Sequence, residues 1–470
     1  MTLLDPAPPH SVNRARPLWP HLVAAMCFAG YLTVSLRQHW LIRTTGYDLG
    51  IFEQAVRAYA DGRPPVVELK GPGFNLLGDH FHPILMLLAP LYRLFPTPET
   101  LLIAQAALVA VSIIPIGRTA VSILGPIGGT CVAVAYGLSW GLQELIGFDF
   151  HEVAFAVPLL AFSLERLLRR QWPAAVAWAV PLVLVKEDLP LTIAALGGYL
   201  VLQRQRRLGL WTMAFGLATT ALVVLVALPL FNPAHHYAYS MQAGSGTPLF
   251  DRLATQAGTV IALLSVGVFV AVRSPVLLLA VPTLGWRFLA DNPSYWGTGF
   301  HYNAVLMVIV FAAFLDAARS LGRHAPDATA SRPSGRLGVV LAAGCLVACA
   351  VHAPGRPLRA VVDPSFWRRD PRVAAAHAIL DRIPDDAEVA ATNRLVPQLT
   401  GRARVRMFPP PGTASTAEWV VADTAVDDWP YRTAEVGAEV STLGAAGYRT
   451  VAGSDGFVLL HRVHPDTTTR

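Results

Sequence analysis

The feature that most constrains this chain is a series of long apolar runs joined by short polar loops. Of its 470 residues, 53% are hydrophobic and only 14% are charged. A soluble protein carries about 25% charged residues, and a helix needs roughly 20 mostly apolar residues to cross a bilayer. The runs therefore predict a mainly α-helical, polytopic membrane bundle.

Charge and cysteine content exclude other classes. The net charge of +6 needs no nucleic acid as a partner, because basic residues in membrane proteins gather in cytoplasmic loops. The four cysteines lie inside apolar segments and lack the spacing of zinc ligands. We therefore expect membrane lipids as the surroundings of the chain and no zinc site.

The apolar runs define eleven candidate spans, and the arginine-rich loops orient them. Clusters such as 166–170 and 203–207 mark the inner side of the membrane. They share one side only if the short apolar segment 81–95 does not cross, so we expect a re-entrant or interfacial helix there, on the outer face. The candidate spans lie near residues 19–41, 99–118, 126–146, 152–168, 173–186, 189–203, 208–230, 256–272, 275–290, 302–320 and 337–353.

This topology divides the chain into three parts in the plasma membrane. Residues 1–18 form a cytoplasmic tail, and residues 19–353 form the transmembrane domain, whose first outer loop covers 42–98. Residues 354–470 are richer in charge and fall outside by the parity of crossings. Their alternating patterns predict a small α/β domain, with strands at 387–392, 403–408, 418–423, 448–453 and 456–463 and helices at 370–383 and 434–447.

The histidines and carboxylates are distributed unevenly between the two sides. The inner loops hold mainly Arg, Gln and small residues, whereas the outer loops hold the acidic and histidine side chains. This asymmetry indicates one polar cavity at the outer ends of the helices. The candidate site residues are Arg43, Asp48, Glu53, Lys70, Asp79, His80, His82, Asp149, His151, Glu152, Lys186, Glu187, Asp188 and His301.

Several of these residues have a structural as well as a functional interpretation. Asp48 begins an amphipathic helix over about 48–60 and is either its N-cap or a catalytic carboxylate. The next cluster of the same loop, 79–82, suits either a divalent cation, Mg²⁺ or Mn²⁺, or a phosphate. It can instead be a polar cap on the helix that begins at Pro83. The run 186–188 is part of the cavity or a self-neutralising surface turn.

The order of features in the first outer loop resembles a known superfamily. A first span is followed by a loop with Tyr-Asp and an amphipathic helix, and then by acid-His-Pro before an apolar run. This order resembles the GT-C membrane glycosyltransferases, which use polyprenyl-phosphate-linked sugars. The stretch GYDLGIFEQAVRAYADGRPPVVELKGPGFNLLGDHFHPILMLLAPLYRLF also resembles a bacterial family of predicted membrane proteins of unknown function (DUF2079), over nearly the whole chain.

The resemblance implies roles for particular residues. Asp48 matches the first-loop aspartate that acts as base or orients the acceptor. Asp79 with His82 and Pro83 matches the acid-His-Pro-Pro element, although His80 intervenes and the second proline is Ile84. The implied reaction moves a sugar from a polyprenyl-phosphate donor to a cell-envelope acceptor outside. The leaving phosphate would be stabilised by a cation held in this cluster, or directly by protonated histidine, Arg43 or Lys70.

Two other classes remain open at this point. A multi-span transporter or lipid flippase also places polar groups in a helix bundle, although near the bilayer midplane. A surface protein without catalytic activity, whose C-terminal domain binds a cell-wall partner, is the second. Polar groups gathered at one end of the spans favour the enzyme.

Overall fold

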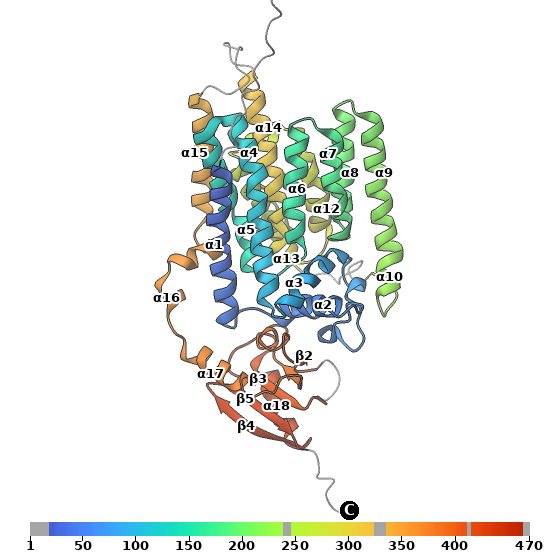
Figure 1. Ribbon diagram of the computed structural model, residues 1–470, viewed down its shortest axis with the longest axis vertical. Coiled ribbons are helices and arrows are strands. Elements are labelled where there is room, and N and C mark those ends of the chain that lie inside the picture. The colour runs from blue at the N-terminus through green and yellow to red at the C-terminus, as the bar shows by residue number, and fades with distance from the viewer. Residues whose placement is uncertain (1–17, 238–245, 324–334, 411–414, 464–470) are drawn as a thin grey trace, which may run out of the picture.

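The computed structural model describes residues 18–237, 246–323, 335–410 and 415–463. The predicted cytoplasmic tail, 1–18, lies outside the described residues apart from Leu18. The described chain forms an upright helix bundle with a small α/β domain at one end (Figure 1). The protein is thus a polytopic helical membrane protein with a C-terminal sheet, as the sequence predicts.

The bundle is built from helices whose apolar content suits a bilayer. Within the described residues, five helical stretches are long and apolar enough to cross a membrane, and further apolar helices are shorter. Several of them continue through short 3₁₀ or π turns. The membrane helices are α1 (Trp19–Trp40), α4 (Glu99–Gly137), α5 (Trp140–Gly147), α6 (Val153–Leu168), α7 (Trp172–Ala179), α8 (Leu189–Leu202), α9 (Arg206–Leu222), α10 (Leu228–Phe231), α11 (Leu249–Val266), α12 (Val281–Leu289), α14 (Ala304–Arg323) and α15 (Gly335–His352).

The long helix α4 is a hairpin that makes two crossings. Gly125 has a φ of 80°, in the left-handed region that glycine adopts without steric cost, and Pro126 follows it. The two arms then run side by side: a Cβ on Gly129 would lie 2.3 Å from the Val121 backbone. The predicted spans 99–118 and 126–146 are therefore the two arms of one hairpin, the second continued by α5.

The apolar segment 81–95 does not cross the bundle. It forms a 3₁₀ turn, Pro83–Leu88, and the short helix α3 (Ala89–Leu94). It lies beside α2 (Ile51–Ala60), at the end that carries the C-terminal domain (Figure 1). Large apolar side chains on it, among them Leu87 and Leu94, stay exposed. These features confirm the predicted interfacial helix.

The C-terminal domain is a five-stranded mixed sheet with helices. The strands are β1 (Glu388–Ala391), β2 (Arg404–Met407), β3 (Trp419–Asp423), β4 (Tyr448–Ser454) and β5 (Phe457–Arg462), in the order β2-β1-β3-β5-β4. β1 pairs in parallel with β2 and β3, and β5 pairs antiparallel with β3 and β4. The helices are α16 (Pro364–Trp367), α17 (Pro371–Leu380) and α18 (Thr433–Leu443). All five predicted strands are present.

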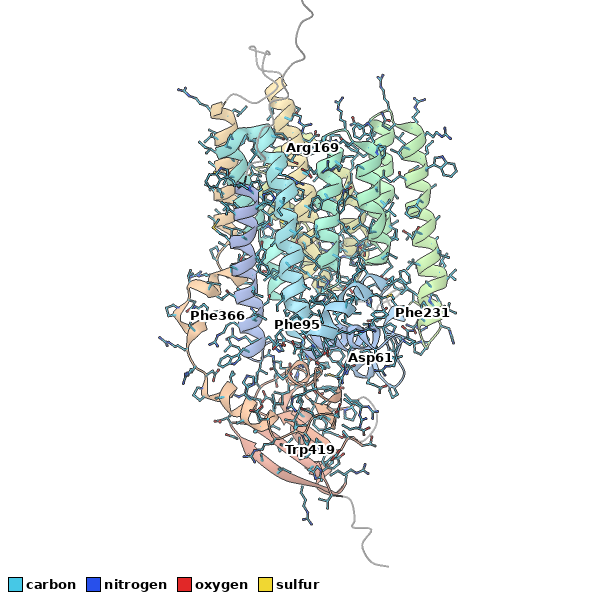
Figure 2. All side chains as sticks on the ribbon, viewed as in Figure 1. Asp61, Phe95, Arg169, Phe231, Phe366 and Trp419 are labelled. Carbon is cyan, nitrogen blue, oxygen red and sulfur yellow. The ribbon has the colours of Figure 1, made fainter. Side chains whose placement is uncertain are left out.

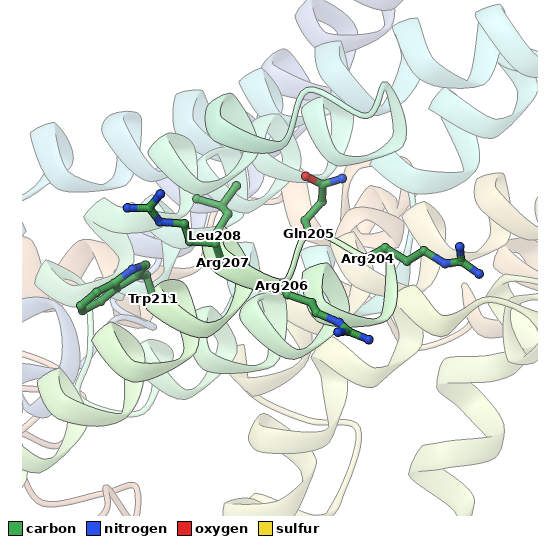
Figure 3. Close-up of a pocket in the computed structure, with 6 residues that line it drawn as sticks. All are labelled: Arg204, Gln205, Arg206, Arg207, Leu208 and Trp211. Atoms are coloured by element: carbon green, nitrogen blue, oxygen red, sulfur yellow. The ribbon is translucent and has the colours of Figure 1, made fainter.

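The two ends of the bundle differ chemically, as the topology predicts. Arg169 lies at the end opposite to Asp61, Phe95 and Phe231 (Figure 2). A cavity of about 560 Å³ at the α8–α9 connection is lined by Arg204, Gln205, Arg206, Arg207, Leu208 and Trp211. Its arginines point in different directions (Figure 3). The α8–α9 connection is therefore a basic loop of the kind that faces a membrane surface, and the side chains around this cavity do not converge on a ligand.

Candidate active site

The candidate site lies where polar loops meet at the end of the bundle that carries the C-terminal domain. The turn before α2 brings Asp48, and the loop before α3 brings residues 79–82. The α5–α6 turn brings 148–152, and the α7–α8 turn brings 185–188. A fifth segment, between α12 and α14, carries the short helix α13 (Pro293–Trp296) and His301.

Asp48 is not a helix cap. It lies inside a π turn, Gly46–Gly50, and α2 begins after Gly50 with no side-chain cap. Its carboxylate instead contacts two side chains: Thr45 Oγ1 is 2.9 Å from Asp48 Oδ2, and His151 Nε2 is 3.3 Å from Asp48 Oδ1. The side chain is 25% exposed. The capping interpretation is therefore wrong, and this carboxylate is both oriented and accessible.

A second carboxyl group, Asp149, shares Thr45 with Asp48. Asp149 Oδ2 accepts a hydrogen bond of 2.7 Å from the Thr45 amide and lies 2.8 Å from its hydroxyl. Burial, together with the charge of Asp48, raises the pKa of Asp149 to about 8. Burial thus favours the neutral form of Asp149. The Thr45 hydroxyl has a single proton, so it can donate to only one of the two carboxyl groups, and the Asp48 carboxylate is the better acceptor when Asp149 is neutral.

Aromatic side chains join the Asp48 region to the loop at 79–82. His151 stacks on His301 with ring centroids 3.7 Å apart. Phe52 makes edge contacts with both His151 and His82, at 5.5 and 5.6 Å. The rings of His82 and His301 are both buried, and their nitrogens make no hydrogen bond to the described residues. Such buried polar atoms need a partner, which in this place would be water or substrate.

The α7–α8 turn sends its charged side chains to different elements. Lys186 Nζ is 2.8 Å from Glu152 Oε1, and Glu187 Oε1 is 2.6 Å from His80 Nδ1. Asp188 Oδ2 accepts a hydrogen bond of 2.8 Å from the indole of Trp286. The interpretation as a self-neutralising surface turn is therefore wrong.

Burial and pairing together set the charges in this region. Burial disfavours the charged forms of Lys186 and His80, but their carboxylate neighbours outweigh it and raise both pKa values above the ordinary range. Burial likewise acts against ionised Glu187, but His80 lowers its pKa to about 2. His82, which has no such direct partner, has its pKa lowered by burial to about 4. Lys186 is therefore a cation of the site, and Glu187 favours the protonated form of His80.

The remaining members of the predicted set lie at its margins. Asp79 Oδ2 is 2.8 Å from Lys70 Nζ. Glu53 is buried against Tyr92, whose hydroxyl donates to it, and burial raises its pKa to about 7. Arg43 is exposed, and its side chain makes no ion pair or hydrogen bond to the described residues. Glu53 and Arg43 thus do not join the cluster around Asp48.

The donor set does not form a metal centre. The described residues hold no group of three or more His, Cys, Asp or Glu side chains placed to ligate an ion. Asp79 is paired with Lys70, and His80 with Glu187. This arrangement is better suited to direct binding of a phosphate by Lys186 and His80 than to binding of a phosphate through a metal ion.

Several contributors were missed by the sequence analysis. Gln105 of α4 fixes the α5–α6 turn by accepting from the His151 amide and donating to the Asp149 carbonyl. Arg287 is fully buried, and it donates to Asn303 Oδ1 at 2.9 Å and to the Gly297 carbonyl at 3.0 Å. An arginine near the end of an apolar run is costly, and this signal could have identified Arg287. Gln105 gave no comparable signal.

The C-terminal domain also reaches the site. Asn393, just after β1, accepts hydrogen bonds from the amides of Gly46 and Tyr47 at 2.8 and 3.1 Å. These amides lie at the start of the turn that carries Asp48. The first amides of a helical turn have no carbonyl partner within the turn, so Asn393 satisfies them from outside. The approach is close: a Cβ on Gly46 would lie 2.8 Å from the Val396 side chain.

The fold is similar to that of solved membrane proteins. The crystal structure of ArnT from Cupriavidus metallidurans bound to undecaprenyl phosphate aligns with a TM-score of 0.55 and 12% identity, over 96% of this chain and 99% of that chain. The arabinosyltransferase EmbB from Mycobacterium smegmatis aligns with a TM-score of 0.39 and 15% identity, over 76% of this chain and 41% of that chain.

The chain itself belongs to the family described as predicted membrane protein (DUF2079), whose model matches residues 38–459. No curated protein matches the sequence. The suspected resemblance to this family is thus confirmed, and the likeness to the ArnT structure confirms the fold that the second resemblance implies.

Proposed function

We propose that this protein is a membrane glycosyltransferase that moves a sugar from a polyprenyl-phosphate donor to an acceptor hydroxyl. The observation that carries the proposal is the setting of Asp48: a partly exposed carboxylate, oriented by Thr45 and His151, at the end where the half-buried cation Lys186 lies. The ArnT structure, which shares the fold, contains undecaprenyl phosphate. This likeness supports a lipid-linked donor.

The proposed reaction moves one proton, from the acceptor hydroxyl, and releases one leaving group, the polyprenyl phosphate. The acceptor oxygen attacks the anomeric carbon of the donor sugar while its proton passes to Asp48. The bond between that carbon and the phosphate oxygen breaks, and its electron pair stays on the polyprenyl phosphate. The raised pKa of Asp149 disfavours a second negative charge beside the base.

The growing charge on the leaving phosphate calls for fixed cations. Lys186 and His80 are held in place by Glu152 and Glu187, each within 2.8 Å. These pairs favour the charged forms of both side chains. The unpaired nitrogens of His82 provide further polar atoms beside them.

The main alternative is a lipid or solute transporter. A transporter would place its charged residues near the midplane of the spans, whereas the residues named here lie in loops at one end of the bundle. Transfer of radiolabelled sugar from a polyprenyl-phosphate extract, measured with purified protein, tests the proposal directly. We expect product with the natural protein and transfer slower by roughly 10²–10⁴-fold with the Asp48→Asn variant. Transport of labelled lipid without any new glycosidic product would overturn it.

We also propose that the N-terminus faces the cytoplasm and that the site and C-terminal domain face outward across the plasma membrane. The basic loops at the opposite end support this orientation. A cysteine at Gly453, exposed on β4, should react with an impermeant reagent in intact cells, and a cysteine at Gln205 should react only after lysis. The reverse pattern would contradict the orientation.

A further inference from the structure

A tight turn of the C-terminal domain lies beside the loop that carries Asp48. Residues 428–431 close this turn through hydrogen bonds between the backbones of Asp428 and Tyr431, at 3.2 and 2.9 Å. Trp429 stands within the turn and is 71% exposed. An indole so exposed contributes little to a hydrophobic core. Core packing therefore does not explain why a tryptophan stands at this position.

The exposed indole is fixed relative to Asp48 by Asn393. The Asn393 amide nitrogen donates to the Trp429 carbonyl at 2.7 Å, while its oxygen accepts from Gly46 and Tyr47. The rings of Trp429 and Tyr47 meet edge to face, with centroids 5.1 Å apart. Tyr47 directly precedes Asp48, so the indole lies next to the proposed base.

A cation accompanies the indole. The Arg394 amide donates to Asp428 Oδ2 at 2.7 Å, and its Nε lies 3.5 Å from Asp428 Oδ1. The Arg394 side chain is 46% exposed, and its terminal nitrogens make no hydrogen bond to the described residues. They remain available to an anion. The Arg394 charge also reaches Asp149, where it opposes the larger effects of burial and Asp48 on the pKa.

We propose that Trp429 and Arg394 form the acceptor-binding side of the site, and that the acceptor is an acidic carbohydrate. This inference rests on the proposed function. The C–H face of a sugar ring packs on the negative face of an aromatic ring, and a guanidinium binds a carboxylate or phosphate through two parallel hydrogen bonds. A hydroxyl of the bound sugar would then lie beside Asp48, which takes its proton as the glycosidic bond forms.

Binding of the purified full-length protein to an array of bacterial envelope oligosaccharides tests the inference without a donor. The array needs neutral, uronic-acid and phosphorylated members, which separate the two kinds of acidic group. We expect the natural protein to bind acidic members. Trp429→Ala should bind roughly 10-fold more weakly, which corresponds to about 1.4 kcal/mol, whereas Trp429→Phe should stay within about threefold. Arg394→Gln should weaken binding of acidic members only.

Two exposed residues away from this turn serve as matched controls. Trp367 of α16 is 53% exposed, and the Arg404 side chain on β2 is 69% exposed. Trp367→Ala and Arg404→Gln should bind the array as the natural protein does. Unchanged thermal unfolding of the Trp429 variants establishes that they are folded.

Three results would overturn the inference. The first is no binding of any array member at millimolar concentration, and the second is equal binding by Trp429→Ala. The third is that Trp429→Ala lowers binding to anionic lipid vesicles instead, which would make the indole a membrane-interface anchor. Because the array needs no sugar transfer, carbohydrate binding lost in Trp429→Ala would uphold Trp429 as part of a carbohydrate site even if the natural protein transferred no sugar; only the acceptor role would then fall with the proposed function.

Discussion

Replacing Asp48 with Asn separates proton transfer from structure at the proposed base. The amide oxygen of the introduced asparagine can still accept the Thr45 hydroxyl, which lies 2.9 Å from the carboxylate of the natural protein. What is lost is the negative charge, which faces His151 at 3.3 Å and would take the acceptor proton. Because the side chain is 25% exposed and caps no helix, we expect less than about 1 kcal/mol of lost stability.

The expected loss of activity is much larger. A positioned general base contributes roughly 10²–10⁴-fold, so the transfer barrier should rise by about 2.7–5.5 kcal/mol. Single-turnover transfer from a radiolabelled polyprenyl-phosphate sugar measures this rate directly. Asp61→Asn is the matched control, since Asp61 lies in the same loop and is exposed in a surface pair with Arg63. Near-normal transfer by Asp48→Asn would refute the reasoning and leave Asp79 or Asp149 as the candidate base.

Three further variants or treatments follow from the structure. Glu187→Gln removes the charge that raises the His80 pKa above 6.5. In this variant His80 should lose its proton at lower pH, and the alkaline limb of the transfer–pH profile should move to lower pH with it. An unmoved profile would exclude protonated His80 from the transfer reaction. In the natural protein, the contribution of protonated His80 to stability is complete below pH 6.5 and is lost as the pH rises through the raised pKa. Gly46→Ala should clash with Val396 and lower both transfer and the melting temperature. Adding Val396→Ala, which removes the Cγ1 contact but keeps Cβ at 2.8 Å, should restore both only in part; no rescue at all would contradict the close docking. Because Asp79 already carries an ion pair, transfer should survive EDTA; loss that Mn²⁺ or Mg²⁺ restores would instead establish a metal.

The bundle could be predicted from sequence because bilayer physics acts on local patterns. Apolar length and loop charge place each span without knowledge of its neighbours. The same rules identified segment 81–95 as non-crossing, because its crossing would have reversed every later basic loop. They separated the spans 99–118 and 126–146 but did not show that one tight bend at Gly125 joins them, since a glycine with positive φ looks like any other glycine in the sequence.

The sequence predicted which residues belong to the site but not which of them contact one another. Its histidines and carboxylates were identified because polar groups at the ends of apolar runs are costly. Which partner each one has depends on contacts more than 100 residues apart, such as Thr45 with Asp149 or His80 with Glu187. Nothing in the local sequence distinguishes Glu53, which is buried elsewhere against Tyr92, from the members that meet.

The Asp48 carboxylate is free to act as a base because a residue of the C-terminal domain accepts the hydrogen bonds from the first amides of its turn. An aspartate at the start of a helix normally bonds to the unsatisfied amides of the first turn, and such a bond would occupy the oxygens that a base needs. Here Asn393 of the C-terminal domain takes the amides of Gly46 and Tyr47. The Asp48 carboxylate, free of capping bonds, contacts Thr45 and His151 instead. Asn393→Ala should leave the Tyr47 amide without its partner, while the Gly46 amide keeps the backbone carbonyl of residue 393. The turn that carries Asp48 should then be held less firmly and transfer should fall; unchanged turnover by this variant would show that Asp48 is oriented without the Asn393 side chain.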